Sequence, residues 1–179
     1  MKSVIIVQAR MGSSRLPGKV LLQAGGKSLL EIQISRLQNV RLAEGICIAT
    51  TRDKHDDVIE SFCRDRGISC YRGPEEDVLS RYYEAALFMN ADEITRITAD
   101  CPLIDYETVD RVIRARRGEG ADYASNTLKR TFPRGLDAEN FSFASLETAW
   151  KEAETPWEHE HVTPSSTAAR SVFIEKYRK

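Results

Sequence analysis

The stretch IIVQARMGSSRLPGKVL, residues 5–21, joins a continuous apolar run to a loop that carries three cations among small residues. The apolar run extends over residues 3–8 and is rich in β-branched side chains, which predicts a strand buried on both faces of a sheet. The cations are Arg10, Arg15 and Lys19. Small residues let backbone amides approach a ligand closely, and nearby cations neutralise a triphosphate and the pyrophosphate that leaves it.

The loop does not match the two common nucleotide-binding signatures. It fits neither G-x-x-x-x-G-K-[ST] nor G-x-G-x-x-G, so it is neither the ordinary P-loop nor the dinucleotide fingerprint. A solvated turn is the alternative, since charged residues usually face water. The position of the loop directly after a buried strand favours a different kind of nucleotide-binding loop.

Length and charge limit what the loop can belong to. With 179 residues, of which 41% are hydrophobic, we expect a single domain over residues 1–179. Lysine plus arginine (26) nearly balance aspartate plus glutamate (27), so no overall basic field draws the chain to nucleic acid or to an anionic membrane. No apolar run approaches the ~20 residues that span a bilayer. Any anion site must therefore be local.

The cysteines indicate the compartment. They show neither C-x-x-C spacing nor the density of a disulfide scaffold, which favours buried free thiols in a reducing cytoplasm. The four are Cys47, Cys63, Cys70 and Cys101.

Strands and helices alternate along the chain. Further buried strands are predicted at 45–50 and 93–98. Apolar side chains recur at helical spacing in four segments, 29–38, 56–66, 77–90 and 106–117. The alternation predicts an α/β fold with a mainly parallel sheet and helices on both faces. In such sheets ligands bind outside the carboxyl ends of the strands, where the loop after the first strand begins.

From residue 121 onward the pattern loosens. The stretch ADYASNTLKRTFPRGLDAENFSF, residues 121–143, mixes a short strand, a turn with proline and glycine, and an alternating run. It predicts an inserted hairpin or flap. A helix from about Ser145 to Glu154 is expected to follow.

A second group of candidate residues lies in RITADCPLID, residues 96–105. Asp100 comes just after a predicted strand, where a carboxylate is well placed to hold Mg²⁺ against phosphate oxygens. The alternative is that Asp100 caps the turn into the next helix. Cys101 is expected to be a small buried residue and not a nucleophile, because no histidine stands near it in the sequence.

Five blocks together resemble a known family. They are QARMGSSRLPGK (8–19), GPEEDVLSRYYEAA (73–86), RITADCPLID (96–105), DYASNTLKRTFPRGLDAE (122–139) and EHEHVTP (158–164). In order and spacing they resemble the spore-coat-polysaccharide type of cytidylyltransferase, within the broader family of CMP-sialic acid and CMP-Kdo synthetases. The resemblance implies a three-layer, Rossmann-like nucleotide-diphospho-sugar transferase fold. It also implies a homodimer.

The resemblance assigns roles on the nucleotide side. It implies that Arg10, Arg15 and Lys19 bind the phosphates of CTP, with Ser13 nearby. It further implies that backbone atoms around Gln8 and Ala9 read the cytosine edge. Positions that usually line the nucleotide or sugar pocket match Arg81 and Arg96. Asp100 would hold the Mg²⁺ between CTP and the acceptor sugar, so that Arg10, Lys19 and Asp100 are the catalytic candidates.

On the sugar side the resemblance implies a flap that contacts the acceptor. Its candidate residues are Asn126, Arg134, Asp137, Glu139 and His161, with Asp137 as a second acid at the metal. A zinc site at His159 and His161 is the weaker alternative, because two histidines at i and i+2 suit only a weak site. We expect His161 to hydrogen-bond within the pocket wall or toward the acceptor.

The sequence departs from the family pattern at three places. GLDAE has alanine where a branched apolar residue is usual, and serines follow HVTP where a tyrosine is common. Relatives continue into a D-x-P-E-D segment whose first acid completes the metal site, whereas this sequence ends at Lys179. We therefore expect that the chain is a truncated version, that Asp137 or a partner's residue substitutes, or that catalysis is impaired.

Three functions follow as hypotheses. The first is a Mg²⁺-dependent cytidylyltransferase that makes a CMP-sugar for a surface polysaccharide. The second is a nucleotide-binding remnant that acts as a binding or scaffold module. The third is a related nucleotidyltransferase that uses another nucleotide, because base readout by the main chain leaves little trace in a sequence.

Overall fold

The computed structural model describes residues 1–13, 16–127, 130–160, 162 and 171–173. The main sheet has seven strands in the order β5-β4-β1-β6-β8-β7-β9. The strands are β1 Ser3–Gln8, β4 Gly45–Thr51, β5 Ser69–Gly73, β6 Glu93–Thr98, β7 Tyr123–Ser125, β8 Glu139–Ser142 and β9 Ser171–Phe173. β8 pairs antiparallel with β6 and β7, and the other pairings are parallel. The expected α/β fold with a mainly parallel sheet is confirmed.

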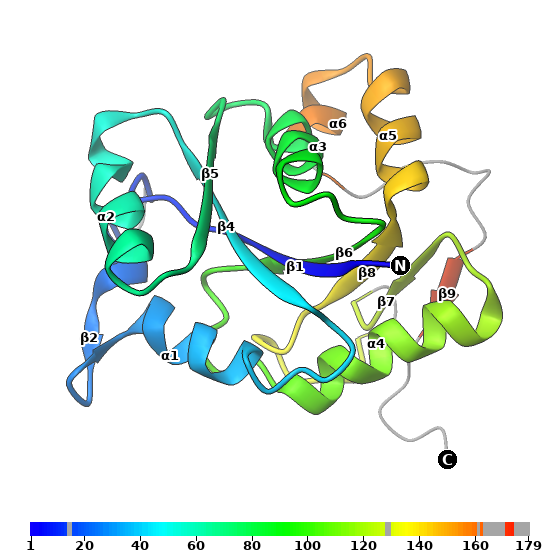
Figure 1. Ribbon diagram of the computed structural model, residues 1–179, viewed down its shortest axis with the longest axis horizontal. Coiled ribbons are helices and arrows are strands. Elements are labelled where there is room, and N and C mark those ends of the chain that lie inside the picture. Colours follow the sequence, from blue (N-terminus) through cyan, green and yellow to red (C-terminus); the bar gives the residue numbers. More distant parts are fainter. Residues whose placement is uncertain (14–15, 128–129, 161, 163–170, 174–179) are drawn as a thin grey trace.

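Helices cover both faces of this sheet. The α-helices are α1 Leu29–Leu37, α2 Asp57–Asp65, α3 Val78–Phe88, α4 Tyr106–Glu119, α5 Phe143–Glu152 and α6 Pro156–Glu160. In Figure 1, α1 and α4 lie below the sheet, and α3 and α5 lie above it. Two 3-10 turns, η1 Lys19–Leu21 and η2 Lys54–Asp56, follow β1 and β4. A small separate hairpin joins β2 Gln23–Ala24 to β3 Lys27–Ser28.

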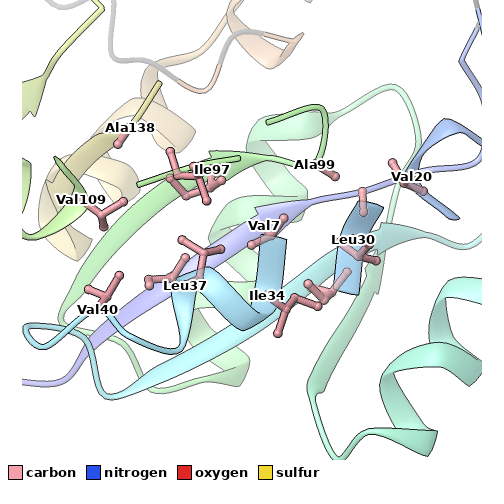
Figure 2. Close-up of a cluster of buried hydrophobic side chains, with 14 of the residues drawn as sticks. Val7, Val20, Leu30, Ile34, Leu37, Val40, Ile97, Ala99, Val109 and Ala138 are labelled. Carbon is pink, nitrogen blue, oxygen red and sulfur yellow. The ribbon is translucent and has the colours of Figure 1, made fainter. Parts of the chain in front are cut away.

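β1 is the middle of the core. Ile5 and Val7 belong to a buried cluster with α1, α2 and α4, while Val4 and Ile6 belong to a second cluster with α3 and α5. Figure 2 shows the first cluster, in which side chains of α1 point at the sheet. Because successive side chains of a strand face opposite sides, a run of apolar residues serves both layers. The predicted burial on both faces is confirmed.

Polar caps determine where several helices begin. The α5 helix begins at Phe143, two residues before the predicted start, because the Ser142 side chain accepts a hydrogen bond from the Ser145 backbone N–H. Such a cap satisfies one of the free N–H groups of the first turn. Asp77 and Asp105 cap α3 and α4 in the same way.

The expected hairpin at 121–143 is present as the antiparallel pair β7 and β8. Both strands belong to the main sheet, since β8 also pairs with β6. The described residues between these two strands, 126–127 and 130–138, lie outside the sheet. β5 was not predicted, because this edge strand has a polar composition and its residues are mostly half-buried.

Candidate functional site

A cleft of about 630 Å³ opens at the carboxyl edge of the parallel strands. Its wall includes Gln8 at the end of β1 and Thr98 at the end of β6. Of the predicted site residues, those that line it are Gln8, Arg10, Ser13, Lys19, Arg96 and Asp100. The predicted loop and the predicted acid therefore share one cleft, at the edge where ligands of parallel sheets bind.

The remaining predicted residues lie elsewhere or outside the described residues. Arg15 and His161 are outside them. Ala9 is buried, and its N–H donates to the Ala49 carbonyl at 3.1 Å. Those that do not line this cleft are Ala9, Arg81, Asn126, Arg134, Asp137 and Glu139.

The loop after β1 is closed by Met11. The Met11 carbonyl accepts from the backbone N–H groups of Ser13 and Gly18, each at 2.9 Å. Gly18 has φ of 69°, a left-handed conformation that glycine adopts without steric cost. Lys19 then begins η1. The bend that Gly18 allows brings Lys19 back to the same cleft as Arg10.

Acidic residues face these cations. Glu75 Oε1 lies 3.4 Å from Arg10 Nη1, and Asp100 Oδ2 lies 3.7 Å from Lys19 Nζ. All four side chains are partly exposed, so each pair contributes little to stability and is readily replaced by a stronger ligand. An anionic ligand in the cleft can therefore bind Arg10 and Lys19 in place of these carboxylates.

The surroundings of Asp100 favour its ionised carboxylate form. Its Oδ1 accepts a hydrogen bond from the Thr98 hydroxyl at 2.6 Å. Partial burial opposes ionisation, but this hydrogen bond and the charge of Lys19 outweigh it and leave the pKa of Asp100 below its usual range. The capping alternative is not what the structure contains, because Asp105 is the residue that caps α4.

Cys101 is buried, as expected. Burial raises the pKa of its thiol, and the negative charges of Asp100 and Asp137 raise it further. A thiol with a raised pKa is a poor nucleophile.

The donor set at Asp100 fits a magnesium ion that shares its ligands with a substrate. Mg²⁺ is usually held by one or two carboxylates together with phosphate oxygens and water. Asp100 is half-exposed to the cleft. Among the described residues there is no cluster of three histidine, cysteine or acidic side chains suited to a metal. Any ion here would depend on the ligand to complete its coordination.

Arg96 reaches the cleft from β6 and is locked in place. Its Nη1 lies 2.6 Å from Glu139 Oε2, and Glu139 also accepts from the Tyr123 hydroxyl at 2.9 Å. Burial alone would lower the pKa of the Arg96 guanidinium, yet the adjacent Glu139 carboxylate raises it above its usual range. Glu139 therefore orients a permanent cation at the wall of the cleft.

Arg81 occupies a different place from the one predicted. It is fully buried, and its guanidinium donates to the backbone carbonyls of Pro74 and Glu75. Burial is the main reason that the pKa of Arg81 is lowered, and the charge of Arg10 acts in the same direction. Arg81 thus supports, from behind, the turn that carries Glu75 into the cleft.

The predicted sugar-side residues shape the connection between β7 and β8. Asn126 donates to the Leu136 carbonyl at 2.7 Å and accepts from the Ala138 N–H at 2.9 Å, which clamps the two ends of the connection. Asp137 pairs with Arg130 at 3.2 Å. Arg134 is exposed.

Several residues of the site were missed in the sequence. Glu75 and Glu76 enter the cleft from the turn before α3, and Pro156 and Glu160 enter it from α6. Asp56 lies behind the loop and accepts from the Met11 N–H at 2.7 Å. Acidic residues are common on surfaces, so no local pattern singled these out.

His159, the first histidine of the zinc alternative, lies 3.0 Å from Asp77 Oδ1. This contact joins α6 to the cap of α3.

No helix in the described part of the chain is long and apolar enough to cross a membrane.

Comparisons with known proteins agree on one protein family. A family model described as "Cytidylyltransferase" matches residues 4–178. The uncharacterized protein MJ1063 of Methanocaldococcus jannaschii is 42% identical over 164 residues, 92% of this chain and 66% of the relative. The spore coat polysaccharide biosynthesis protein SpsF of Bacillus subtilis is 38% identical over 124 residues, 67% of this chain and 52% of the relative. This chain therefore spans between half and two thirds of the length of these relatives.

One solved structure closely resembles this fold. It is a cytidylyltransferase from Leptospira borgpetersenii, with a TM-score of 0.93 and 35% identity, covering 99% of this chain and 77% of that one.

Proposed function

Because this chain belongs to the cytidylyltransferase family, we propose that it transfers CMP from CTP to an acidic or related sugar and releases pyrophosphate. The relative SpsF is named for spore coat polysaccharide biosynthesis, so the proposed product is a CMP-sugar for a surface polysaccharide. The observation that carries the proposal is the gathering of Arg10, Lys19 and Asp100 in one cleft at the carboxyl edge of the sheet.

In the proposed reaction a sugar oxygen attacks the α-phosphorus of CTP. A bond forms between that oxygen and the α-phosphorus, and the bond from the α-phosphorus to the bridging oxygen of the β-phosphate breaks. Little covalent work falls on the protein, so positioning and charge neutralisation carry the catalysis. Arg10 and Lys19 neutralise the phosphates and then the departing pyrophosphate.

Other residues position the two substrates. Backbone atoms at Gln8, which lines the cleft, read the cytosine, and Arg96 presents a fixed cation because Glu139 holds it at 2.6 Å. Asp100, with Asp137 as a second acid, would hold Mg²⁺, which supplies positive charge against phosphate oxygens. The connection between β7 and β8 borders the acceptor.

The experiment that tests the proposal is calorimetric titration of CTP, ATP, GTP and UTP into the purified chain, with and without Mg²⁺. We expect selective binding of CTP that Mg²⁺ strengthens. Lys19→Ala should weaken CTP binding about tenfold or more, the scale of losing one hydrogen bond to a charged group. Lys27→Ala is the matched control, since Lys27 is exposed on the β2–β3 hairpin. Equal affinity in both variants would contradict the assignment of the loop.

Turnover is measured separately as pyrophosphate release with a panel of acidic sugars. Asp100→Asn should bind CTP and lose both the Mg²⁺ enhancement and the release of pyrophosphate. CTP binding with no release from any sugar would favour the second hypothesis, a nucleotide-binding module. The mass of the active species in solution tests the proposed homodimer.

A further inference from the structure

Asp56 lies outside the cleft but touches the loop that lines it. It is the last residue of η2, and the residue is only 2% exposed. β1 and β4 are parallel neighbours with Gln8 paired to Ala49, so the turn after β4 comes beside the loop after β1. An aspartate buried there needs hydrogen bonds to offset the cost of taking its charge out of water.

The two carboxylate oxygens of Asp56 have separate partners. Oδ1 accepts from the Met11 backbone N–H at 2.7 Å. Oδ2 accepts from the Thr51 backbone N–H at 3.2 Å and from the Thr51 hydroxyl. One oxygen therefore holds the loop, while the other holds the end of β4.

Met11 is the residue through which this bond reaches the cations. Its N–H is held by Asp56, and its carbonyl closes the loop by accepting from Ser13 and Gly18, each at 2.9 Å. Arg10 immediately precedes Met11, and Lys19 immediately follows Gly18. A shift of Met11 would move both cations relative to the strands.

We propose that Asp56 is the positioning residue of the phosphate loop, which it fixes through Met11 before any ligand binds. This inference rests on the proposed function, because it takes the loop to be the site of the triphosphate. A loop held in place beforehand loses less conformational entropy when the ligand arrives, which raises affinity. Asp56 acts through Met11 and touches neither substrate.

The test compares Asp56→Ala with Thr51→Val, using inorganic triphosphate and CTP as probes. Thr51→Val keeps the shape of the buried side chain and removes its hydroxyl bond to Asp56, so it controls for lost stability. Both variants should melt at lower temperature. Asp56→Ala should also bind triphosphate about tenfold more weakly when fully folded, the scale of losing a hydrogen bond to a charged group. Thr51→Val should bind it as the wild type does.

Affinity that is equal in the two folded variants would overturn the proposal, whatever their melting temperatures. If Asp56→Ala does not fold, exchange of the Met11 amide hydrogen in the ligand-free wild type decides. The proposal requires that this amide be protected from exchange, and rapid, unprotected exchange would refute it. If the wild type binds triphosphate but does not prefer CTP over other nucleotides, the proposed function is wrong. The triphosphate affinities of Asp56→Ala and Thr51→Val would still test the role of Asp56.

Discussion

Glu75 contributes a negative charge to a cleft whose proposed ligand is an anion. Its Oε1 lies 3.4 Å from Arg10 Nη1 and would lie 3.6 Å from a Cβ atom placed on Gly12. The carboxylate therefore rests over the loop, beside a residue without a side chain. A triphosphate that contacts Arg10 must compete with Glu75 for the same cation.

We predict that Glu75→Gln binds inorganic triphosphate about threefold more tightly than the wild type, because partly exposed ion pairs of this kind are weak. The matched control is Glu76→Gln, which removes the same charge from the neighbouring position in the cleft. The gain should also vanish in an Arg10→Ala background, as a double-mutant cycle by calorimetry would show. Weaker binding by Glu75→Gln would mean that Glu75 instead holds Arg10 in its productive position.

At the scale of elements, the amino end of α3 joins three helices. Asp77 caps α3 by accepting from the Ser80 N–H at 2.8 Å, and it lies 3.0 Å from His159 of α6. The Ser80 hydroxyl accepts in turn from Trp150 Nε1 of α5 at 3.0 Å. Since α6 supplies part of the cleft wall, this cap connects the stability of α3 to the shape of the site.

We predict that Asp77→Ala lowers the free energy of unfolding by about 1–2 kcal/mol, the usual effect of losing a cap. Asp77→Asn keeps a capping oxygen and loses the charge that faces His159. It should therefore lower the free energy of unfolding by less than Asp77→Ala does. Asp105→Asn is the control, because Asp105 caps α4 through Thr108 in the same manner. Chemical denaturation measures all three variants. A loss in Asp105→Asn as large as in Asp77→Asn would show that the contact with His159 contributes nothing.

At the scale of the whole molecule, a buried ionic network ties α4 to the sheet. Glu93 of β6 is fully buried and accepts from Arg116 and Arg117 of α4, with Arg117 Nη2 at 2.6 Å from Glu93 Oε2. Arg116 also donates to Asn140 of β8 at 2.6 Å. The network holds together the junction between the parallel strands and the antiparallel part of the sheet.

We predict that Glu93→Gln lowers the free energy of unfolding by about 3 kcal/mol near neutral pH, because it leaves buried guanidinium groups without their anion. Glu119→Gln, an exposed change at the end of α4, should have little effect. Denaturation at neutral pH measures both variants. A change in Glu93→Gln as small as that in Glu119→Gln would contradict the role of the network.

The difference in free energy of unfolding between the wild type and Glu93→Gln should also depend on pH. Burial opposes the charge on Glu93, but hydrogen bonds from the arginines outweigh it, so its folded-state pKa lies below the ordinary value of 4.5. Its contribution is therefore fully present well above pH 4.5 and is lost as the pH falls through the lowered pKa. The difference between wild type and Glu93→Gln should shrink in denaturation curves below that pH. A difference that stays constant down to pH 3 would contradict this assignment.

The sequence by itself determined the elements whose signal is local. β1 and β6 have the predicted bounds, because an unbroken apolar run buries both faces of a central strand. The helical spacing of apolar residues placed α1 to α4 within about two residues of their ends. The cations of the loop were also identifiable, since their chemistry and their position after a buried strand are both written in consecutive residues.

Only the tertiary structure decided which distant residues meet. Asp56 and Met11 are 45 positions apart, Glu75 and Arg10 are 65 apart, and Arg96 and Glu139 are 43 apart. It also placed Arg81 behind the wall of the cleft and not in it. Such contacts depend on strand order, register and the packing of turns at one edge of the sheet. No local periodicity encodes them, so the partners of the loop become visible only when the parallel strands bring their carboxyl ends together.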